Sequence, residues 1–536
     1  MTQTAAEAIA ETLAAAGCSH AFGMPGGEVL VLLDALDRAG VSFILCKHEN
    51  AAGFMAEGAW QATGAPGVLL TTIGPGLANG VNSVANAFQE QVPLVVLSGC
   101  IGPAPASQFT HQVIDQQALL APITKASFQV AEGNAHAVVQ KALALALADP
   151  PGPVHIDLPD TLARTPAPDL PGPARFTERA TLGPGAVLDT ALQRLRHARA
   201  PLILAGIGAV LHGAGDAIRA LAETHGIPVL TTYKAKGIVP EHHPLALGGH
   251  GLSPLSDKHV LPLLRASDCI LCFGYDPIEM RSDWIRPWEP EQALEFCHAQ
   301  AEHGMHGSAL RWVGDVRSVV TALSDGLREP LSGLWPGEEP QQVRAALTRA
   351  FARRDGWGPH AVFHALNSEL PEASVLTVDS GAHRILFSQI FTAKRPGHLL
   401  QSAAFCTMGV ALPLAIGVKC ARPETPVVAV MGDAGLDMAP GDLATLRDMG
   451  LALTVVVLVD DALTLIGRKQ AAMQLPECGV VFGRTDFVAL ARAYGGHGET
   501  VRDSTSLAKA LNEAAGRDCF TILACEIDKQ DYQGAF

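Results

Sequence analysis

The sequence predicts an α/β fold of three doubly wound domains, each with a parallel sheet between layers of helices. Short apolar segments that suit buried strands alternate with helical patterns along the chain, which is typical of parallel sheets covered on both faces. At 536 residues the chain is too long for a single hydrophobic core. Two turn-rich stretches, 161–184 and 329–339, predict the boundaries between domains.

The domains are therefore expected at 1–165, 185–326 and 342–536. Apolar segments of strand length define each sheet. In the first domain they are Ala21–Phe22, Phe43–Leu45, Gly67–Leu70, Pro93–Leu97 and Val154–Asp157. In the second they are Pro201–Leu204, Val229–Thr232 and Cys269–Cys272. In the third they are Val375–Val378, Val427–Val430, Thr454–Val459 and Thr521–Ala524.

The charge and composition of the chain indicate which kind of partner and which compartment to expect. The formal net charge of −15 argues against a nucleic-acid partner, which needs clustered Lys and Arg, and favours a small-molecule substrate. The N-terminus lacks the pattern of a signal peptide, and no apolar run approaches the roughly 18 residues of a membrane span, so we expect a cytoplasmic protein. Eleven scattered cysteines indicate thiols rather than a disulfide framework. Cys269 and Cys272 form a C-x-x-C within a strand, where they should point to opposite faces and not share a metal.

The strongest functional signal is a pair of strand ends in the third domain. One strand ends at the small-residue turn Gly432–Gly435, and the next ends at Asp460. Free backbone N–H groups in such a turn can meet a diphosphate, and carboxylates at neighbouring strand ends can share Mg²⁺. Asp433 and Asp460 stand 27 residues apart in the numbering, the length of one strand-helix-strand crossover. An acidic turn pair without a metal is the alternative.

This pattern resembles the metal motif of thiamine-diphosphate enzymes, in which Gly-Asp-Gly is followed after about 27 residues by Asn or Asp and, two residues later, by a ligating carbonyl. The resemblance implies that Asp433, Asp460 and the carbonyl of Ala462 bind Mg²⁺. It also implies that the turn binds the diphosphate of thiamine diphosphate through Gly432, Asp433, Ala434 and Gly435. Ala434 replaces the usual Gly, and Asp460, where most members have Asn, is similar to catabolic, flavin-independent acetolactate synthases.

A second motif of the same family lies where a strand end turns into an Ala-rich helix, at Lys47–Ala56. A His-Glu pair at a helix start is commonly only a cap that suits the helix dipole. The resemblance implies more for Glu49: contact with the pyrimidine nitrogen of the cofactor, which favours the imino tautomer that removes the thiazolium proton. Glu49 is thus the predicted catalytic residue.

Other segments match the family around the cofactor. In Phe405–Pro413, Met408 corresponds to the apolar residue beneath the cofactor and Cys406 to the residue whose carbonyl holds the pyrimidine amino group, although Met on a helix face commonly serves core packing. The remaining cofactor contacts implied by the resemblance are Gly74 and Asn79 in the loop 72–79, and Gly381, Ala382 and His383 after a strand. A simple turn is the alternative for 380–383.

On the substrate side, the resemblance implies that Gln112 donates a hydrogen bond to the substrate oxygen, with His111 beside it. Leu465 and Ile466 correspond to apolar pocket residues of acetolactate synthases that also contact the cofactor. Lys469 stands where those enzymes have Trp or Gln, so the acceptor could carry a negative charge, or Lys469 could point to solvent. The last predicted members are Gly26 and Gly27 at the catalytic centre and Glu28 in the substrate pocket.

The resemblance covers essentially the whole chain, in the order pyrimidine-binding, central and diphosphate-binding domain. It implies a carboligase of the acetolactate-synthase type, which decarboxylates a 2-oxo acid and adds the resulting enamine to a second carbonyl. A 2-oxo acid decarboxylase or an aldehyde lyase such as benzaldehyde lyase is the alternative, because Val113–Gln117 resembles a lyase segment. A non-catalytic homologue is disfavoured by intact Glu49, Asp433 and Asp460.

The middle domain and the subunit arrangement complete the expectations. Phe273–Glu279 is similar to catabolic acetolactate synthases, and Gly206–Gly208 is too short a match to predict a flavin site. In the family, the Glu that matches Glu49 faces the diphosphate domain of another subunit. We therefore expect a homodimer or homotetramer with active sites at subunit interfaces.

Overall fold

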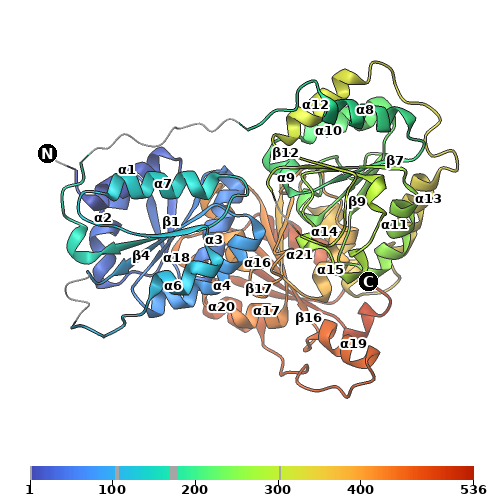
Figure 1. The fold of residues 1–536 in the computed structure, drawn as a ribbon. Coiled ribbons are helices and arrows are strands. Elements are labelled where there is room, and N and C mark those ends of the chain that lie inside the picture. The colour runs from blue at the N-terminus through green and yellow to red at the C-terminus, as the bar shows by residue number, and fades with distance from the viewer. Residues whose placement is uncertain (1–2, 103–107, 169–178, 301–302) are drawn as a thin grey trace.

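The computed structural model describes residues 3–102, 108–168, 179–300 and 303–536, and its elements form three parallel sheets of six strands each (Figure 1). Helices cover both faces of every sheet, which confirms the predicted three-domain α/β class. None of the helices in these ranges is long and apolar enough to cross a membrane.

The N-terminal sheet has the strand order β2-β1-β3-β4-β6-β5. Its strands are β1 His20–Gly23, β2 Ser42–Leu45, β3 Gly67–Thr71, β4 Leu94–Cys100, β5 Ala126–Gln129 and β6 Val154–Pro159. Its helices are α1 Ala5–Ala15, α2 Leu30–Arg38, α3 Glu49–Thr63, α4 Pro75–Glu90, α6 Gln116–Leu120 and α7 Ala135–Leu147. Residues 163–167 do not act as a linker, because Ala163 and Ala167 are buried in this domain's core and Thr4 pairs with Pro166. Residues 169–178 of the predicted linker lie outside the described ranges.

The middle sheet has the order β12-β11-β10-β7-β8-β9. Its strands are β7 Pro201–Ala205, β8 Val229–Thr231, β9 Ala246–Gly249, β10 Cys269–Phe273, β11 Ala293–Cys297 and β12 Leu310–Val313. Its helices are α8 Ala186–His197, α9 Ile207–Leu211, α10 Gly215–His225, α11 Pro254–Ala266 and α12 Val316–Gly326, and α13 Glu339–Ala350 leads to the next domain. Cys269 and Cys272 belong to different apolar clusters on either side of β10, as the strand geometry predicts.

The C-terminal sheet has the order β14-β13-β15-β16-β18-β17. Its strands are β13 Val375–Val378, β14 Leu399–Gln401, β15 Val427–Gly432, β16 Thr454–Val459, β17 His497–Val501 and β18 Thr521–Glu526. Its helices are α14 Pro359–Glu369, α15 Ala382–Ile390, α16 Ala411–Ala421, α17 Asp433–Met438, α18 Asp442–Asp448, α19 Thr464–Ala472, α20 Phe487–Ala493 and α21 Ser504–Ala515.

The N- and C-terminal domains share one apolar core, although they lie at opposite ends of the chain. Helices α3 and α16 pack against each other so closely that two glycines are required. A Cβ on Gly58 would lie 2.2 Å from the carbonyl oxygen of Leu414, and one on Gly417 would lie 1.9 Å from that of Met55. This contact fixes the sheet edge that carries Asp433 relative to the helix that begins at Glu49.

Candidate active site

Asp433 and Asp460 meet at the carboxyl ends of the neighbouring strands β15 and β16. Oδ2 of Asp433 accepts the backbone N–H groups of Asp460 at 3.0 Å and Asp461 at 2.7 Å, and Oδ1 accepts that of Ala434 at 2.8 Å. Oδ2 of Asp460 accepts the hydroxyl of Thr464 at 2.5 Å. The crossover therefore places two carboxylates at one sheet edge, in orientations fixed by hydrogen bonds.

The electrostatics of this pair suit a cation. Burial raises the pKa of Asp433, and burial together with the nearby charge of Asp433 raises the pKa of Asp460 to about 7. Two carboxylates at one sheet edge, Asp433 buried and Asp460 half-buried, repel each other unless a proton or a metal ion neutralises them. Oxygen-rich sites of this kind are typical of Mg²⁺.

Beside the two aspartates lies a cavity of about 420 Å³ that is open to solvent. It is bounded by the C-terminal domain and by a segment of the middle domain at Ile278–Arg281. The predicted residues that line it are Gly381, Ala382, His383, Cys406, Met408, Gly432, Asp433, Ala434, Gly435, Asp460, Ala462, Leu465, Ile466 and Lys469. Segments from four parts of the sequence thus converge on one space.

The cavity also has lining residues that the sequence did not single out, above all Arg281 and Arg384. Arg384 is buried and donates to the carbonyl of Ser402 and to Sγ of Cys406 at 3.2 Å. A single arginine on a helix or in a loop carries no pattern that marks it as a pocket residue, so sequence reasoning had no signal for either.

Unpartnered polar atoms face this cavity from the segment 380–384. The Oγ of Ser380, the Nε2 of His383 and the Nε of Arg384 are buried without a hydrogen-bond partner. Burial lowers the pKa of His383 to about 3, which keeps its ring neutral. Because buried polar groups are normally paired, these atoms indicate that a polar ligand belongs in the cavity.

The N-terminal half of the predicted site is built around Glu49, the first residue of α3. Glu49 is buried, and its Oε2 accepts the side-chain amide of Asn79 at 3.0 Å. The first turn of α4 comes so close that a Cβ on Gly76 would lie 3.1 Å from Oε1 of Glu49. Two residues that the sequence predicted separately are thus hydrogen-bonded partners.

Glu28 and Gln116 anchor the loop 72–74, which precedes α4 and lies beside Glu49. Oε1 of Glu28 accepts the backbone N–H of Ile73 at 2.7 Å and the hydroxyl of Thr72, so Glu28 supports the loop. Buried Gln116, which the sequence analysis missed, accepts the N–H of Gly74 at 2.7 Å and donates to Asp157 at 2.5 Å.

Gly74 has a φ of +65° and lies against the loop that carries Gln112, since a Cβ there would lie 2.2 Å from the carbonyl oxygen of Gln112. The side chains of His111 and Gln112 are exposed, as is Gly27, and Gly26 is half-buried. Neither these residues nor Glu49 and Asn79 line the C-terminal cavity. Within one chain, the structure therefore divides the predicted site into two halves.

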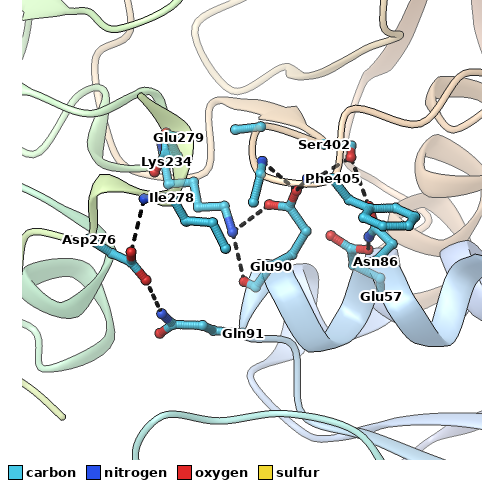
Figure 2. Close-up of polar contacts among 12 residues, drawn as sticks. Glu57, Asn86, Glu90, Gln91, Lys234, Asp276, Ile278, Glu279, Ser402 and Phe405 are labelled. Atoms are coloured by element: carbon cyan, nitrogen blue, oxygen red, sulfur yellow. Dashed lines mark hydrogen bonds and ion pairs between the residues drawn. The ribbon is translucent and has the colours of Figure 1, made fainter. Parts of the chain in front are cut away.

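A buried network at the junction of the three domains holds the loop that carries Cys406 and Met408 (Figure 2). Oε1 of Glu90, at the end of α4, accepts the backbone N–H groups of Ala404 at 2.7 Å and Phe405 at 3.0 Å. Lys234 of the middle domain forms an ion pair with Glu90 and donates to its carbonyl oxygen at 2.8 Å. The loop on the cavity wall is thus fixed by residues of the other two domains.

Two further carboxyl groups border this network. Burial, reinforced by the charge of Glu90, raises the pKa of Glu57 to about 8, and burial raises that of Glu279 to about 7. Glu57 accepts the amide of Asn86 at 2.9 Å, and Glu279 accepts the backbone N–H of Lys234 at 3.1 Å. Because Lys234 can balance only one negative charge, protonated carboxyl groups complete the charge balance.

Comparison with known proteins identifies the family to which this geometry belongs. Residues 3–119 match the thiamine pyrophosphate enzyme N-terminal TPP binding domain, residues 188–323 the central domain and residues 379–525 the C-terminal TPP binding domain.

Three relatives cover nearly the whole chain. The probable acetolactate synthase large subunit of Methanocaldococcus jannaschii is 30% identical over 95% of this chain and 89% of its own length. The acetolactate synthase isozyme 3 large subunit of Escherichia coli is 29% identical over 95% of this chain and 92% of its own. The probable 2-ketoarginine decarboxylase AruI of Pseudomonas aeruginosa is 28% identical over 97% and 94%. The chain therefore belongs to the thiamine pyrophosphate enzymes and is an enzyme that makes or breaks carbon–carbon bonds.

Proposed function

We propose that the enzyme binds thiamine diphosphate with Mg²⁺ and acts as a carboligase of the acetolactate-synthase type on a 2-oxo acid. The observation that carries the cofactor assignment is the convergence of Asp433, Asp460 and the unpartnered Ser380 and His383 on one cavity. When bound, thiamine diphosphate supplies an electron sink that stabilises the negative charge left beside a carbonyl carbon.

The residues of the cavity fit such a group. Asp433, Asp460 and the carbonyl of Ala462 would hold Mg²⁺. The N–H of Ala434 is accepted by Asp433, but the N-cap residue Gly432 has no side chain to accept the other N–H groups at the start of α17, which leaves these for an anion. A Cβ on Gly432 would lie 3.2 Å from the ring of His383, so the glycine allows the turn and the histidine to pack closely. Ser380 and His383 would complete the contacts of the diphosphate.

The remaining predicted residues would act around the reacting atoms. Met408 and the carbonyl of Cys406 would orient the pyrimidine ring, while Leu465 and Ile466 exclude water from the substrate. Glu49 would hold a proton at its carboxyl group and pass it to and from the pyrimidine nitrogen, with Asn79 fixing the orientation of that carboxyl group. The loop with Gln112 and the backbone of Gly26 and Gly27 would contact the substrate.

We propose that two copies of the chain complete each site, because Glu49 does not line the C-terminal cavity of its own chain. Both halves carry exposed apolar side chains, as expected of surfaces that meet a partner. Beside the Glu49 half these are Leu30, Phe109 and Ile114, and beside the cavity they are Met438, Ile466 and Met473. A homodimer, alone or within a tetramer, satisfies this requirement.

We further propose a cytoplasmic location. All eleven cysteines are free, including the exposed Cys406 and Cys478, which suits a reducing compartment.

For the reaction, the acetolactate-synthase relatives support carboligation, and the 2-ketoarginine decarboxylase supports simple decarboxylation as the second candidate. A substrate with a cationic tail fits poorly, because the cationic residues Arg281, Arg384 and Lys469 line the cavity. We therefore favour a substrate whose tail is small or anionic.

Product analysis tests this function. The purified enzyme is incubated with thiamine diphosphate, Mg²⁺ and pyruvate, without flavin, and the products are identified by mass spectrometry. Carboligation yields CO₂ and acetolactate from the wild type and neither from Glu49→Gln. Acetaldehyde in place of acetolactate assigns simple decarboxylation. An enzyme that binds the cofactor and converts no 2-oxo acid contradicts the proposal.

A further inference from the structure

A second cavity opens directly beside the first, on the far side of α19. The two cavities share the wall made by Arg281, the segment Ala462–Leu465 and Lys469. The second is completed by α19 and by residues of the C-terminal segment, among them Lys529 and Phe536. The two cavities are therefore neighbours, and Arg281 and Lys469 lie at their shared boundary.

The second cavity is strongly cationic in a protein with a formal net charge of −15. Its charged side chains are those of Arg281, Arg468, Lys469 and Lys529, with Glu477 as the single side-chain carboxylate. Lys529 is neutralised by Glu477 at 2.7 Å. Within the described part of the chain, no carboxylate forms an ion pair with Arg281, Arg468 or Lys469.

The three unneutralised cations are placed by different elements. Arg281 ends the middle-domain segment 278–281 that borders the first cavity, is half-buried and itself lines both cavities. Arg468 and Lys469 belong to α19, and the guanidinium of Arg468 lies over the ring of Phe536, 5.8 Å from its centroid. Three cations that line one cavity without an ion-pair partner give it a positive potential, which attracts an anion.

We propose that the second cavity binds an anionic group at the far end of the substrate, so that the preferred 2-oxo acid carries a second negative charge. This inference rests on the proposed function, since it takes the reacting carbonyl to lie in the first cavity. The apolar side chains of Leu463 and Leu465 line both cavities and offer a surface for the carbon chain between the two anionic ends.

The chemistry of the three cations defines the ligand class. Guanidinium groups bind carboxylate, phosphonate or sulfonate oxygens with paired hydrogen bonds, and the ammonium of Lys469 adds a mobile point charge. A 2-oxo acid with a terminal carboxylate is the simplest member of this class. A neutral tail of the same length leaves the three cations without a counter-ion.

The test compares two unreactive acids of equal length on the holoenzyme, glutarate with two carboxylates and pentanoate with one. Isothermal titration calorimetry at low salt measures both affinities. We expect glutarate to bind about tenfold or more tightly than pentanoate, and the difference to shrink in high salt because exposed charges are screened. Lys469→Met and Arg468→Gln should each weaken glutarate binding about three- to tenfold and change pentanoate binding by less than about twofold.

Lys509→Met is the matched control, since it removes one exposed positive charge from α21, away from both cavities. It should leave both affinities unchanged. Lys469→Glu should reverse the preference towards pentanoate. Equal binding of the two acids by the wild type, or equal loss of both in the α19 variants, overturns the inference.

The binding assay also separates this inference from the proposed function. Selective glutarate binding in a protein that converts no 2-oxo acid leaves the anion site intact and rejects the reaction. Turnover of pyruvate without selectivity between glutarate and pentanoate keeps the reaction and rejects the anion site.

Discussion

The C-terminal half of the predicted site is a cavity, whereas the N-terminal half is a surface. In the cavity, polar atoms of Ser380 and His383 are buried without partners, and two carboxylates lie at one sheet edge. In the N-terminal half, buried Glu49 already has a partner in Asn79, while Phe109 and Ile114 in the neighbouring loop are exposed. Unpartnered polar atoms in the cavity half favour a polar ligand, and exposed apolar side chains at the N-terminal half favour a facing protein surface. This comparison supports the proposal that each half meets its counterpart from a second copy of the chain.

The largest effect is expected from the N-terminal half. Glu49→Gln removes the proton that this carboxyl group would hold, so turnover should fall about 10²–10⁴-fold while thiamine diphosphate still binds. Steady-state kinetics and cofactor titration measure the two quantities separately. Glu57→Gln, on the same helix, should change turnover by less than about threefold, because Glu57 has a pKa of about 8 and is largely neutral at pH 7. Comparable losses in both variants would mean that Glu49 acts through helix α3 and not through chemistry.

In the cavity half, Asp433→Asn should weaken Mg²⁺ activation about tenfold or more, because the variant loses a charged oxygen ligand. The readout is the Mg²⁺ concentration that gives half-maximal cofactor binding and half-maximal activity. Asp437→Asn serves as the control, since Asp437 lies on the same helix but is exposed and bonds to Thr485. An unchanged Mg²⁺ requirement in Asp433→Asn would contradict a Mg²⁺ site at this sheet edge.

The junction of the three domains can be weakened at Glu90, which is not one of the predicted site residues. Glu90→Gln leaves Lys234 buried without its paired charge, a change that costs about 3–5 kcal/mol and should lower the Tm. Because Glu90 also holds the N–H groups of Ala404 and Phe405, cofactor affinity should fall as well. The double variant Glu90→Gln/Lys234→Met should regain part of the Tm but less of the affinity. Normal cofactor affinity in Glu90→Gln would show that the loop does not depend on this anchor.

The smallest effect concerns the pH dependence of stability at the same junction. The pKa of Glu57 is raised from an ordinary value of 4.5 to about 8 in the folded protein, so folding favours its protonated form. Its unfavourable contribution therefore grows as the pH rises from about 4.5 to about 8. Glu57→Gln stays neutral, so its Tm relative to the wild type should rise by roughly 2–4 °C between pH 6 and pH 8. Thermal melts at both pH values measure this, and a constant difference would contradict the assigned titration.

Strands in the interior of a sheet were mostly predictable from the sequence, whereas most edge strands were not. The predicted segment Phe43–Leu45, which belongs to the edge strand β2, is the exception. Thr454–Val459 is continuously apolar and lies in the middle of its sheet, as expected. Strands β5, β12, β14 and β17 lie at sheet edges, where half-exposed polar residues or a length of three residues hide the pattern. The strands β9 and β11 were missed because one contains two glycines and the other a buried glutamate, Glu295.

The same distinction applies to the candidate site. Asp433 and Asp460 could be placed together because consecutive parallel strands end at the same sheet edge. Contacts between domains depend on how the domains dock, and no local pattern encodes them. Examples are the ion pair of Lys234 with Glu90 and the presence of Arg281 and Lys469 in the lining of one cavity. The support that Glu28 and Gln116 give to the loop 72–74 likewise becomes visible only in the packed structure.

The most direct measurement mixes the variants Glu49→Gln and Asp433→Asn at a low Mg²⁺ concentration, at which Asp433→Asn alone is inactive. After subunit exchange, each mixed dimer has one site with both substitutions and one with neither, so the mixture should recover about a quarter of the wild-type activity. The separate variants should stay inactive under the same treatment. If each site were formed within one chain, no mixed dimer would contain an intact site, and a mixture with no activity after proven subunit exchange would contradict the account.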